Sequence, residues 1–169
     1  SSAASDVYKR QVQRAIAHGE LIRWTKGFDN PNTEGRDCAD MLRTSLKRFN
    51  VPVKLSSIIN DTTGTLIASN YVDPRTKIAC IFGTGCNAAY MESIGNIPKL
   101  SNLDLPADEQ MVINCEYGAF DSFEHRYLGS LRSKYDVEID LSSNKPNQQA
   151  FEKMIAGKYL GEIYRLVLC

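Results

Sequence analysis

The chain has 169 residues and a mass of 18.9 kDa, and its 43% hydrophobic and 24% charged residues are typical of a soluble globular domain. Twenty basic side chains balance twenty acidic ones, so no positive excess indicates nucleic acid or an anionic membrane as a partner. The longest apolar runs, such as residues 78–82, have about five residues, whereas a bilayer needs about 20. We therefore expect a folded protein with no membrane span and no nucleic-acid partner.

The five cysteines are odd in number and have no CxxC spacing, so they predict neither a metal site nor a secreted disulfide framework. Cys80 and Cys115 lie in apolar runs, which predicts buried free thiols. No secretory segment is present near the start. These features together predict a cytoplasmic protein.

Both ends of the chain lack the usual signals of a complete domain. Residues 1–11 are small or polar without a period, and we interpret them as a non-native leader. Residues 158–169 stop within an amphipathic pattern that has no Gly, Asn or Pro stop signal. The chain is therefore expected to be a piece of a longer protein.

In the first part of the chain, residues 12–20 have the apolar spacing of a short helix, and an extended run follows. Asp37 is placed to cap a helix over residues 38–49, where apolar side chains recur at steps of three and four. Residues 53–59 predict a strand. Residues 62–71 are compatible with a strand or a helix.

Further along, residues 78–82 and 88–92 predict two strands joined across a Gly-Thr-Gly turn, which is the pattern of a hairpin. Residues 111–116 predict another strand. Helical spacing returns over residues 148–154 and 157–168. Strands mixed with helices, without an internal repeat, predict an α/β fold.

Polar residues follow two of the predicted strands. Asn60 and Asp61 come directly after one, and Asn114 and Glu116 end another. Ligands of open α/β sheets bind outside the carboxyl ends of strands. Carboxylates and amides together accept and donate hydrogen bonds, which suits a ligand rich in hydroxyl groups.

Each of these signals also has a structural explanation. Asp61 is equally suited to cap a following helix. Glu116 and Glu152 are compatible with solvated surface positions, and most glycine turns only connect strands. The residues alone leave these alternatives open.

Five segments in order closely resemble the hexokinase family, most of all its fungal members: LIRWTKGFDNPNTEGRD, IINDTTGTLIAS, IFGTGCNAAY, INCEYGAFD and QQAFEKMIAGKYLGEI. The resemblance extends over about residues 12–169. It implies part of an actin-like, ribonuclease-H-related α/β fold in which two lobes close over a cleft. Residues 12–60 would then belong to the small lobe and residues 61–169 to the large lobe.

The resemblance also implies roles for individual residues. The residues that it assigns to sugar hydroxyls are Thr25, Lys26, Asn60, Asn87, Glu116 and Glu152. Asp61 would also contact the sugar as the catalytic base, and Lys26 would also approach the transferring phosphate. Gly83, Thr84 and Gly85 would lie against the ATP phosphates.

The implied reaction is ATP-dependent phosphorylation of a hexose at its C6 hydroxyl, with glucose as the expected substrate and fructose and mannose as further candidates. An aspartate that accepts the hydroxyl proton accelerates such a step by about 10² to 10⁴. Mg²⁺ would arrive on the ATP phosphates. The family's first phosphate loop, an upstream serine segment and the adenosine segment have no counterpart here, so the chain alone is expected to be inactive.

Three alternatives remain. A glycoside hydrolase would pair Asp61 with Glu116 or Glu152, but the Gly-Thr-Gly turn argues against it. A non-catalytic sugar sensor related to hexokinase is made less favourable by the presence of Asp61 and Lys26. An inactive truncated product is the third.

Overall fold

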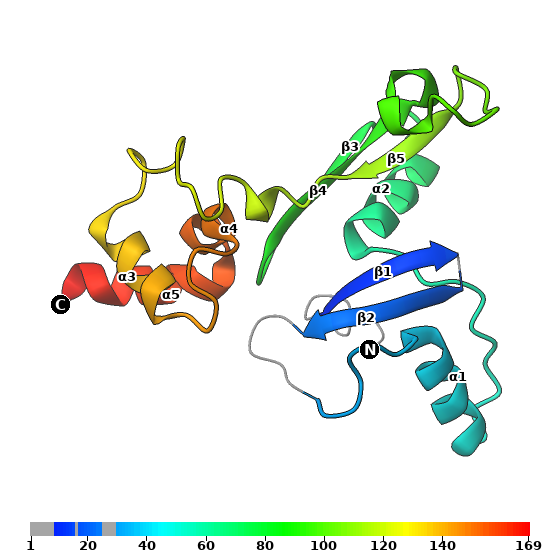
Figure 1. The fold of residues 1–169 in the computed structure, drawn as a ribbon, viewed down its shortest axis with the longest axis horizontal. Coiled ribbons are helices and arrows are strands. Elements are labelled where there is room, and N and C mark those ends of the chain that lie inside the picture. Colours follow the sequence, from blue (N-terminus) through cyan, green and yellow to red (C-terminus); the bar gives the residue numbers. More distant parts are fainter. Residues whose placement is uncertain (1–8, 16, 25–29) are drawn as a thin grey trace. The chain divides into compact units, whose positions relative to one another are not determined.

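The computed structural model describes residues 9–15, 17–24 and 30–169, whose helices and strands are labelled in Figure 1. The chain divides into two compact units between Asp61 and Thr62. Among the described residues, no helix is both long enough and apolar enough to cross a membrane.

The first unit begins with an antiparallel hairpin. Strand β1 (Lys9–Ala15) pairs with strand β2 (His18–Trp24). The helix expected over residues 12–20 is therefore wrong. A helix of nine residues is marginal on its own, whereas pairing two strands satisfies the backbone groups of both. Residues 9–11, which we assigned to the leader, take part in this pairing.

Helix α1 (Cys38–Arg48) is confirmed, and Asp37 caps it as predicted. The Asp37 Oδ1 atom accepts hydrogen bonds from the amides of Ala39 (2.9 Å) and Gly19 (3.0 Å). Burial raises the pKa of Asp37, but the two amides and the nearby His18 and Arg43 together lower it by more. The pKa of Asp37 therefore lies below its usual value. One carboxylate thus joins the helix to the hairpin.

The strand expected over residues 53–59 is not formed, and helix α2 (Asp61–Val72) follows directly. A strand requires a neighbour to pair with its backbone, and no described strand pairs with this segment. Val53 and Ile59 are correspondingly exposed. Residues 62–71, which the sequence left open, are helical.

The second unit contains the antiparallel sheet β3-β4-β5, formed by Ile78–Phe82, Cys86–Ser93 and Gln110–Asn114. The predicted hairpin and third strand are therefore confirmed. Helix α2 covers one face, where the fully buried Leu66 packs against Ala79 and Ala89. The residues between β4 and β5 include two short 3-10 turns, η2 (Ile94–Asn96) and η3 (Pro98–Leu100).

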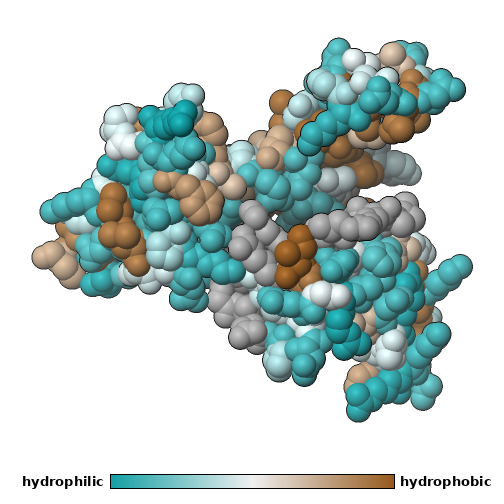
Figure 2. Space-filling model, in the orientation of Figure 1, coloured by the Kyte–Doolittle hydropathy of each residue, from teal (hydrophilic) through white to brown (hydrophobic). Residues whose placement is uncertain are grey.

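The opposite face of this sheet is open, and the prediction of buried thiols at Cys80 and Cys115 is wrong. Both cysteines are exposed. Cys80 pairs with Ala88, and the Cys115 amide donates to the Ala88 carbonyl, so both lie on the face away from α2. Phe82, two positions after Cys80 in β3, lies on the same face and is 75% exposed. Figure 2 shows hydrophobic residues at the surface of the part of the molecule that carries the sheet.

The remaining elements are the 3-10 turn η4 (Tyr117–Ala119) and helices α3 (Lys134–Ser142), α4 (Ala150–Ile155) and α5 (Gly157–Leu168). The two last helices confirm the sequence prediction. Helix α3 was not predicted, although a capping box between Ser133 and Asp136 marks its start.

A buried ion-pair network joins α3 to α4. Asp140 is 1% exposed, and its carboxylate accepts hydrogen bonds from Lys153 Nζ (2.6 Å), Arg132 Nη2 (2.9 Å) and the Asn147 amide (3.0 Å). Lys153 Nζ also donates to Ser143 Oγ and to the Lys145 carbonyl, both at 2.8 Å. Every proton of this buried ammonium group therefore has an acceptor.

We predict that Asp140→Asn destabilises this part of the chain by about 3 to 5 kcal/mol, because it leaves the Lys153 charge buried without its counter-ion. The measurement is urea unfolding of the whole chain followed by circular dichroism. Hydrogen exchange of the α3 and α4 amides locates the loss. The exposed Asp104→Asn is the control, and equal stability of the two variants would contradict the prediction.

The network also predicts a dependence of stability on pH. Burial raises the pKa of Asp140, but Lys153, the Asn147 amide and Arg132 outweigh it, so the pKa in the folded state lies below that of an unperturbed aspartate. The stabilisation is then complete above that value and is lost as the pH falls through the folded pKa. In Asp140→Asn this part of the acid dependence is expected to disappear.

Candidate functional site

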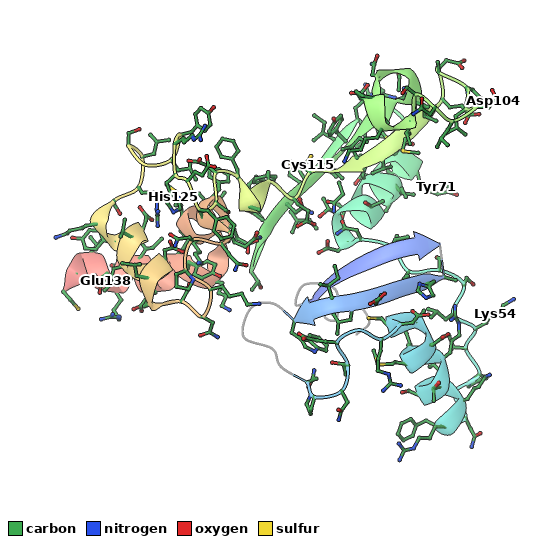
Figure 3. The ribbon with its side chains drawn as sticks, in the orientation of Figure 1. Lys54, Tyr71, Asp104, Cys115, His125 and Glu138 are labelled. Atoms are coloured by element: carbon green, nitrogen blue, oxygen red, sulfur yellow. The ribbon has the colours of Figure 1, made fainter. Side chains whose placement is uncertain are left out.

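Three polar side chains form a cluster at the end of the sheet where β4 begins and β5 ends. Asn87 Nδ2 donates to Asn114 Oδ1 (2.7 Å) and to Glu116 Oε1 (3.3 Å). Asn114 Nδ2 donates to the same Glu116 Oε1 at 2.9 Å. In Figure 3 the label of Cys115, between Asn114 and Glu116 in sequence, marks the place where β5 ends. Two predicted sugar residues, Asn87 and Glu116, thus lie side by side.

The backbone of Glu116 has a left-handed conformation, with φ 50° and ψ 39°. A residue with a Cβ atom adopts this region at a cost of about 1 kcal/mol or more, and such residues are frequent at functional sites. The Glu116 amide compensates by donating to Asn87 Oδ1 at 2.9 Å. The turn directs the chain from β5 into η4.

Glu152, the other predicted sugar carboxylate, lies on α4 and is 5% exposed. Its Oε2 atom accepts a hydrogen bond from the Cys86 amide at 2.9 Å, at the first residue of β4. Its second oxygen, Oε1, accepts no hydrogen bond from the described residues. Gly118 permits this approach, because a Cβ atom there would lie 3.1 Å from Glu152 Cβ and 3.2 Å from the Cys86 carbonyl oxygen.

Two aromatic side chains pack against each other near Glu152. Tyr117 and Phe151 have ring centroids 5.8 Å apart. Burial, and after it the neighbouring Cys86 thiol, raises the pKa of Tyr117 to about 12. Tyr117 therefore remains a neutral phenol at physiological pH, beside the carboxylate that holds the start of β4.

The Gly-Thr-Gly turn, residues 83–85, is held by the first amides of α5. The Gly157 amide donates to the Gly83 carbonyl (2.8 Å), and the Lys158 amide donates to the Thr84 carbonyl (3.2 Å). Within the described part of the chain, the amides of Thr84 and Gly85 make no backbone hydrogen bond. With the carbonyls of Gly83 and Thr84 directed at α5, the turn can use the amide of the exposed Thr84 as a donor to an anionic ligand, whereas Gly85 is buried.

Asn60 and Asp61 are half-buried, and both take part in interactions of the structure. Asp61 is the first residue of α2, where a carboxylate also favours the helix through its dipole. Thr25 and Lys26 lie outside the described residues.

The first turn of α2 lies near one particular end of the sheet, because of the direction in which the helix runs. Residues 73–77 connect α2 to β3 by a short turn, so the helix and the strand run in opposite directions (Figure 1). The first turn of α2 therefore lies toward the end of the sheet where β3 ends and β4 begins. The Gly-Thr-Gly turn and Asn87 lie at that end too.

The sequence did not assign two residues that the site depends on. Asn114 was noticed at a strand end, but only the structure shows that it contacts both Asn87 and Glu116. Gly157 had no local signal, since its importance comes from Gly83, more than seventy positions earlier.

We predict opposite effects for alanine at two glycines of α5. A Cβ atom at Gly157 would lie 2.9 Å from the Gly83 carbonyl oxygen, so Gly157→Ala should displace the Gly-Thr-Gly turn and destabilise by about 1 to 3 kcal/mol. Gly161 has nothing within 4 Å of the added atom, and Gly161→Ala should stabilise the helix by about 1 kcal/mol. Urea unfolding measures both, and equal effects would contradict the proposed contact.

Comparisons with known proteins agree on one family. Two family models described as Hexokinase match residues 77–169 and residues 11–71. The hexokinase of Emericella nidulans is 58% identical over 157 residues, which are 93% of this chain and 31% of that protein. Hexokinase-1 of Saccharomyces cerevisiae is 51% identical over 92% of this chain and 32% of its own length. The chain thus spans about a third of the curated relatives that it matches.

A solved structure, the hexokinase of Schistosoma mansoni complexed with glucose, superposes with a TM-score of 0.80 at 37% identity. The match covers 95% of this chain and 35% of that one. The resemblance drawn from the sequence motifs is therefore confirmed. Since one of the family models alone matches more than half of it, the chain belongs to the hexokinase family, and its mixed α/β fold is part of the actin-like fold of that family.

Proposed function

We propose that the chain supplies the hexose site, the catalytic base and one phosphate loop of an enzyme that transfers phosphate from ATP to the C6 hydroxyl of a hexose. The observation that carries the proposal is the gathering of Asn87, Glu116 and Glu152 around the start of β4, next to the Gly-Thr-Gly turn. Glucose is the first candidate substrate, because a related hexokinase has been solved in complex with it.

The two carboxylates suit sugar hydroxyls as hydrogen-bond acceptors. In Glu116, Oε1 accepts hydrogen bonds from the side-chain amides of Asn87 and Asn114, which leaves Oε2 to accept one from a sugar hydroxyl. In Glu152, Oε2 accepts a hydrogen bond from the Cys86 amide, which leaves Oε1 to accept one from another hydroxyl. Hydrogen bonds to charged acceptors are about twice as strong as neutral ones. Thr25, Lys26 and Asn60 complete the proposed set.

The chemical step assigned to this chain is a proton transfer. A carboxylate oxygen of Asp61 accepts the proton of the C6 hydroxyl as the hydroxyl oxygen attacks the terminal phosphorus atom of ATP. Lys26 stabilises the negative charge on the transferring group. Closure over the sugar excludes water, which would otherwise compete as the nucleophile.

The Gly-Thr-Gly turn fits the phosphates of ATP. Thr84 is exposed, so its amide, which makes no backbone hydrogen bond to a described residue, and its hydroxyl can both act as donors. Mg²⁺ bound to the ATP phosphates would supply further charge neutralisation. A cytoplasmic location belongs to the same proposal and is supported by five free cysteines.

The proposal is tested in a hybrid in which this chain replaces the matching third of the Emericella nidulans hexokinase. We predict that Asp61→Asn lowers kcat for glucose phosphorylation by about 10² to 10⁴, because it removes the proton acceptor. Glucose affinity, measured by calorimetry, should change far less. Asp104→Asn, at an exposed position, is the control. Near-normal turnover in Asp61→Asn would refute the assignment of the base.

A second prediction concerns the two carboxylates of the sugar site. In the same hybrid, Glu116→Gln and Glu152→Gln should each weaken glucose binding by about 1 to 3 kcal/mol, because a hydroxyl loses a charged acceptor. Glu138→Gln, on the exposed face of α3, is the control and should bind glucose normally. If both site variants bound glucose as the unaltered hybrid does, the proposed pocket would be wrong.

A further inference from the structure

The side-chain amide of Asn114 completes the polar cluster at the end of β5, because it contacts both of the other members. Its Oδ1 accepts from Asn87 Nδ2 at 2.7 Å, and its Nδ2 donates to Glu116 Oε1 at 2.9 Å. Asn114 therefore uses both ends of its amide, one on each of two proposed sugar residues. Among side chains of this size, only an amide both accepts and donates in this way.

The orientation of Asn87 is fixed by backbone groups. Its Oδ1 accepts from the amides of Ala88 (2.8 Å) and Glu116 (2.9 Å), so its NH₂ group must face the other way. The two acceptors on that side are Asn114 Oδ1 and Glu116 Oε1. The direction of the Asn114 amide follows from this, since its oxygen must face Asn87.

The Glu116 carboxylate is in turn fixed through one oxygen. Oε1 accepts hydrogen bonds from Asn114 and Asn87, whereas no described residue donates to Oε2. Glu116 itself is exposed, and its long side chain would otherwise sample many rotamers. A carboxylate held by one oxygen presents the other in a defined direction.

We propose that Asn114 is a positioning residue, which holds Glu116 and Asn87 in the arrangement that binds a hydroxyl-rich ligand of hexose size. This inference rests on the proposed function of the site. Asn114 acts through Glu116 and Asn87, and its hydrogen bonds to both side chains are already formed before the ligand binds. Pre-organisation of this kind strengthens binding because less side-chain freedom is lost on association.

Asn114 is suited to a test because its side chain is exposed and lies outside the cluster of Leu66, Ala79 and Ala89. Gln110 offers a matched control at the other end of the same strand. Its Nε2 donates to Ser93 Oγ at 2.9 Å, so Gln110→Ala also removes a cross-strand hydrogen bond of β5. Any general weakening of β5 will appear in both variants.

In the hybrid hexokinase, Asn114→Ala should raise the KM for glucose by about 5- to 20-fold, with kcat within about threefold, as expected for a lost hydrogen-bonding group in binding. Asn114→Asp should be worse than Asn114→Ala, because it places a second negative charge beside Glu116. Gln110→Ala should leave KM unchanged. Melting temperatures of Asn114→Ala and Gln110→Ala should agree.

A second measurement needs no ligand. In the 169-residue chain, Asn114→Ala should accelerate hydrogen exchange of the Glu116 amide, whose acceptor Asn87 loses its support, and Gln110→Ala should not. An unchanged KM in Asn114→Ala would overturn the inference if Glu116→Gln still raises KM. A fall in melting temperature without a change in exchange at Glu116 would also overturn it. An unchanged KM in Glu116→Gln would instead refute the proposed sugar site.

Discussion

The pairing of Lys153 with Asp140 in the protein interior is the interaction on which the candidate site depends. Helix α4 has six residues and no side-chain cap, so it is too short to be stable by its own hydrogen bonds. The buried Lys153 anchors it through three acceptors, and the adjacent residue is Glu152. The buried charge of Lys153 thereby fixes the position of Glu152, whose carboxylate accepts the hydrogen bond of the Cys86 amide.

The Gly-Thr-Gly turn is then held from two sides. The Glu152 carboxylate accepts a hydrogen bond from the amide of Cys86, the residue after the turn. The first amides of α5 donate to the carbonyls of Gly83 and Thr84. Both contacts come from residues about 70 positions later in the chain, on helices packed against α3. A turn that anchors its carbonyls in this way keeps its amides in one orientation, which is what binding an anion without reorganisation requires.

The sequence predicted those parts of the fold that depend on local patterns. Helix α1 with its cap at Asp37, the hairpin around Gly83 and helix α5 all have periodic or turn signals within a few residues. The failures concern partners distant in the sequence. Residues 12–15 and 18–20 form strands because β1 and β2 pair with each other, and residues 53–59 have no described strand to pair with. Cys80 is exposed because Ala79 takes the face toward α2. In the same way Glu116 was found from a motif, whereas the contacts of Asn114 needed coordinates.

The proposed work of the site is divided among elements that the fold keeps separate. The proposed sugar acceptors, Glu152 and Glu116, lie on α4 and after β5, where side-chain amides and one backbone amide fix their direction. The proposed base begins α2, a helix fixed on the sheet by Leu66. Because α2 and β3 run in opposite directions, the start of this helix lies toward the sheet end that carries Asn87. Under the proposed function, sugar affinity and proton transfer would therefore depend on different contacts, and a substitution could change one without the other.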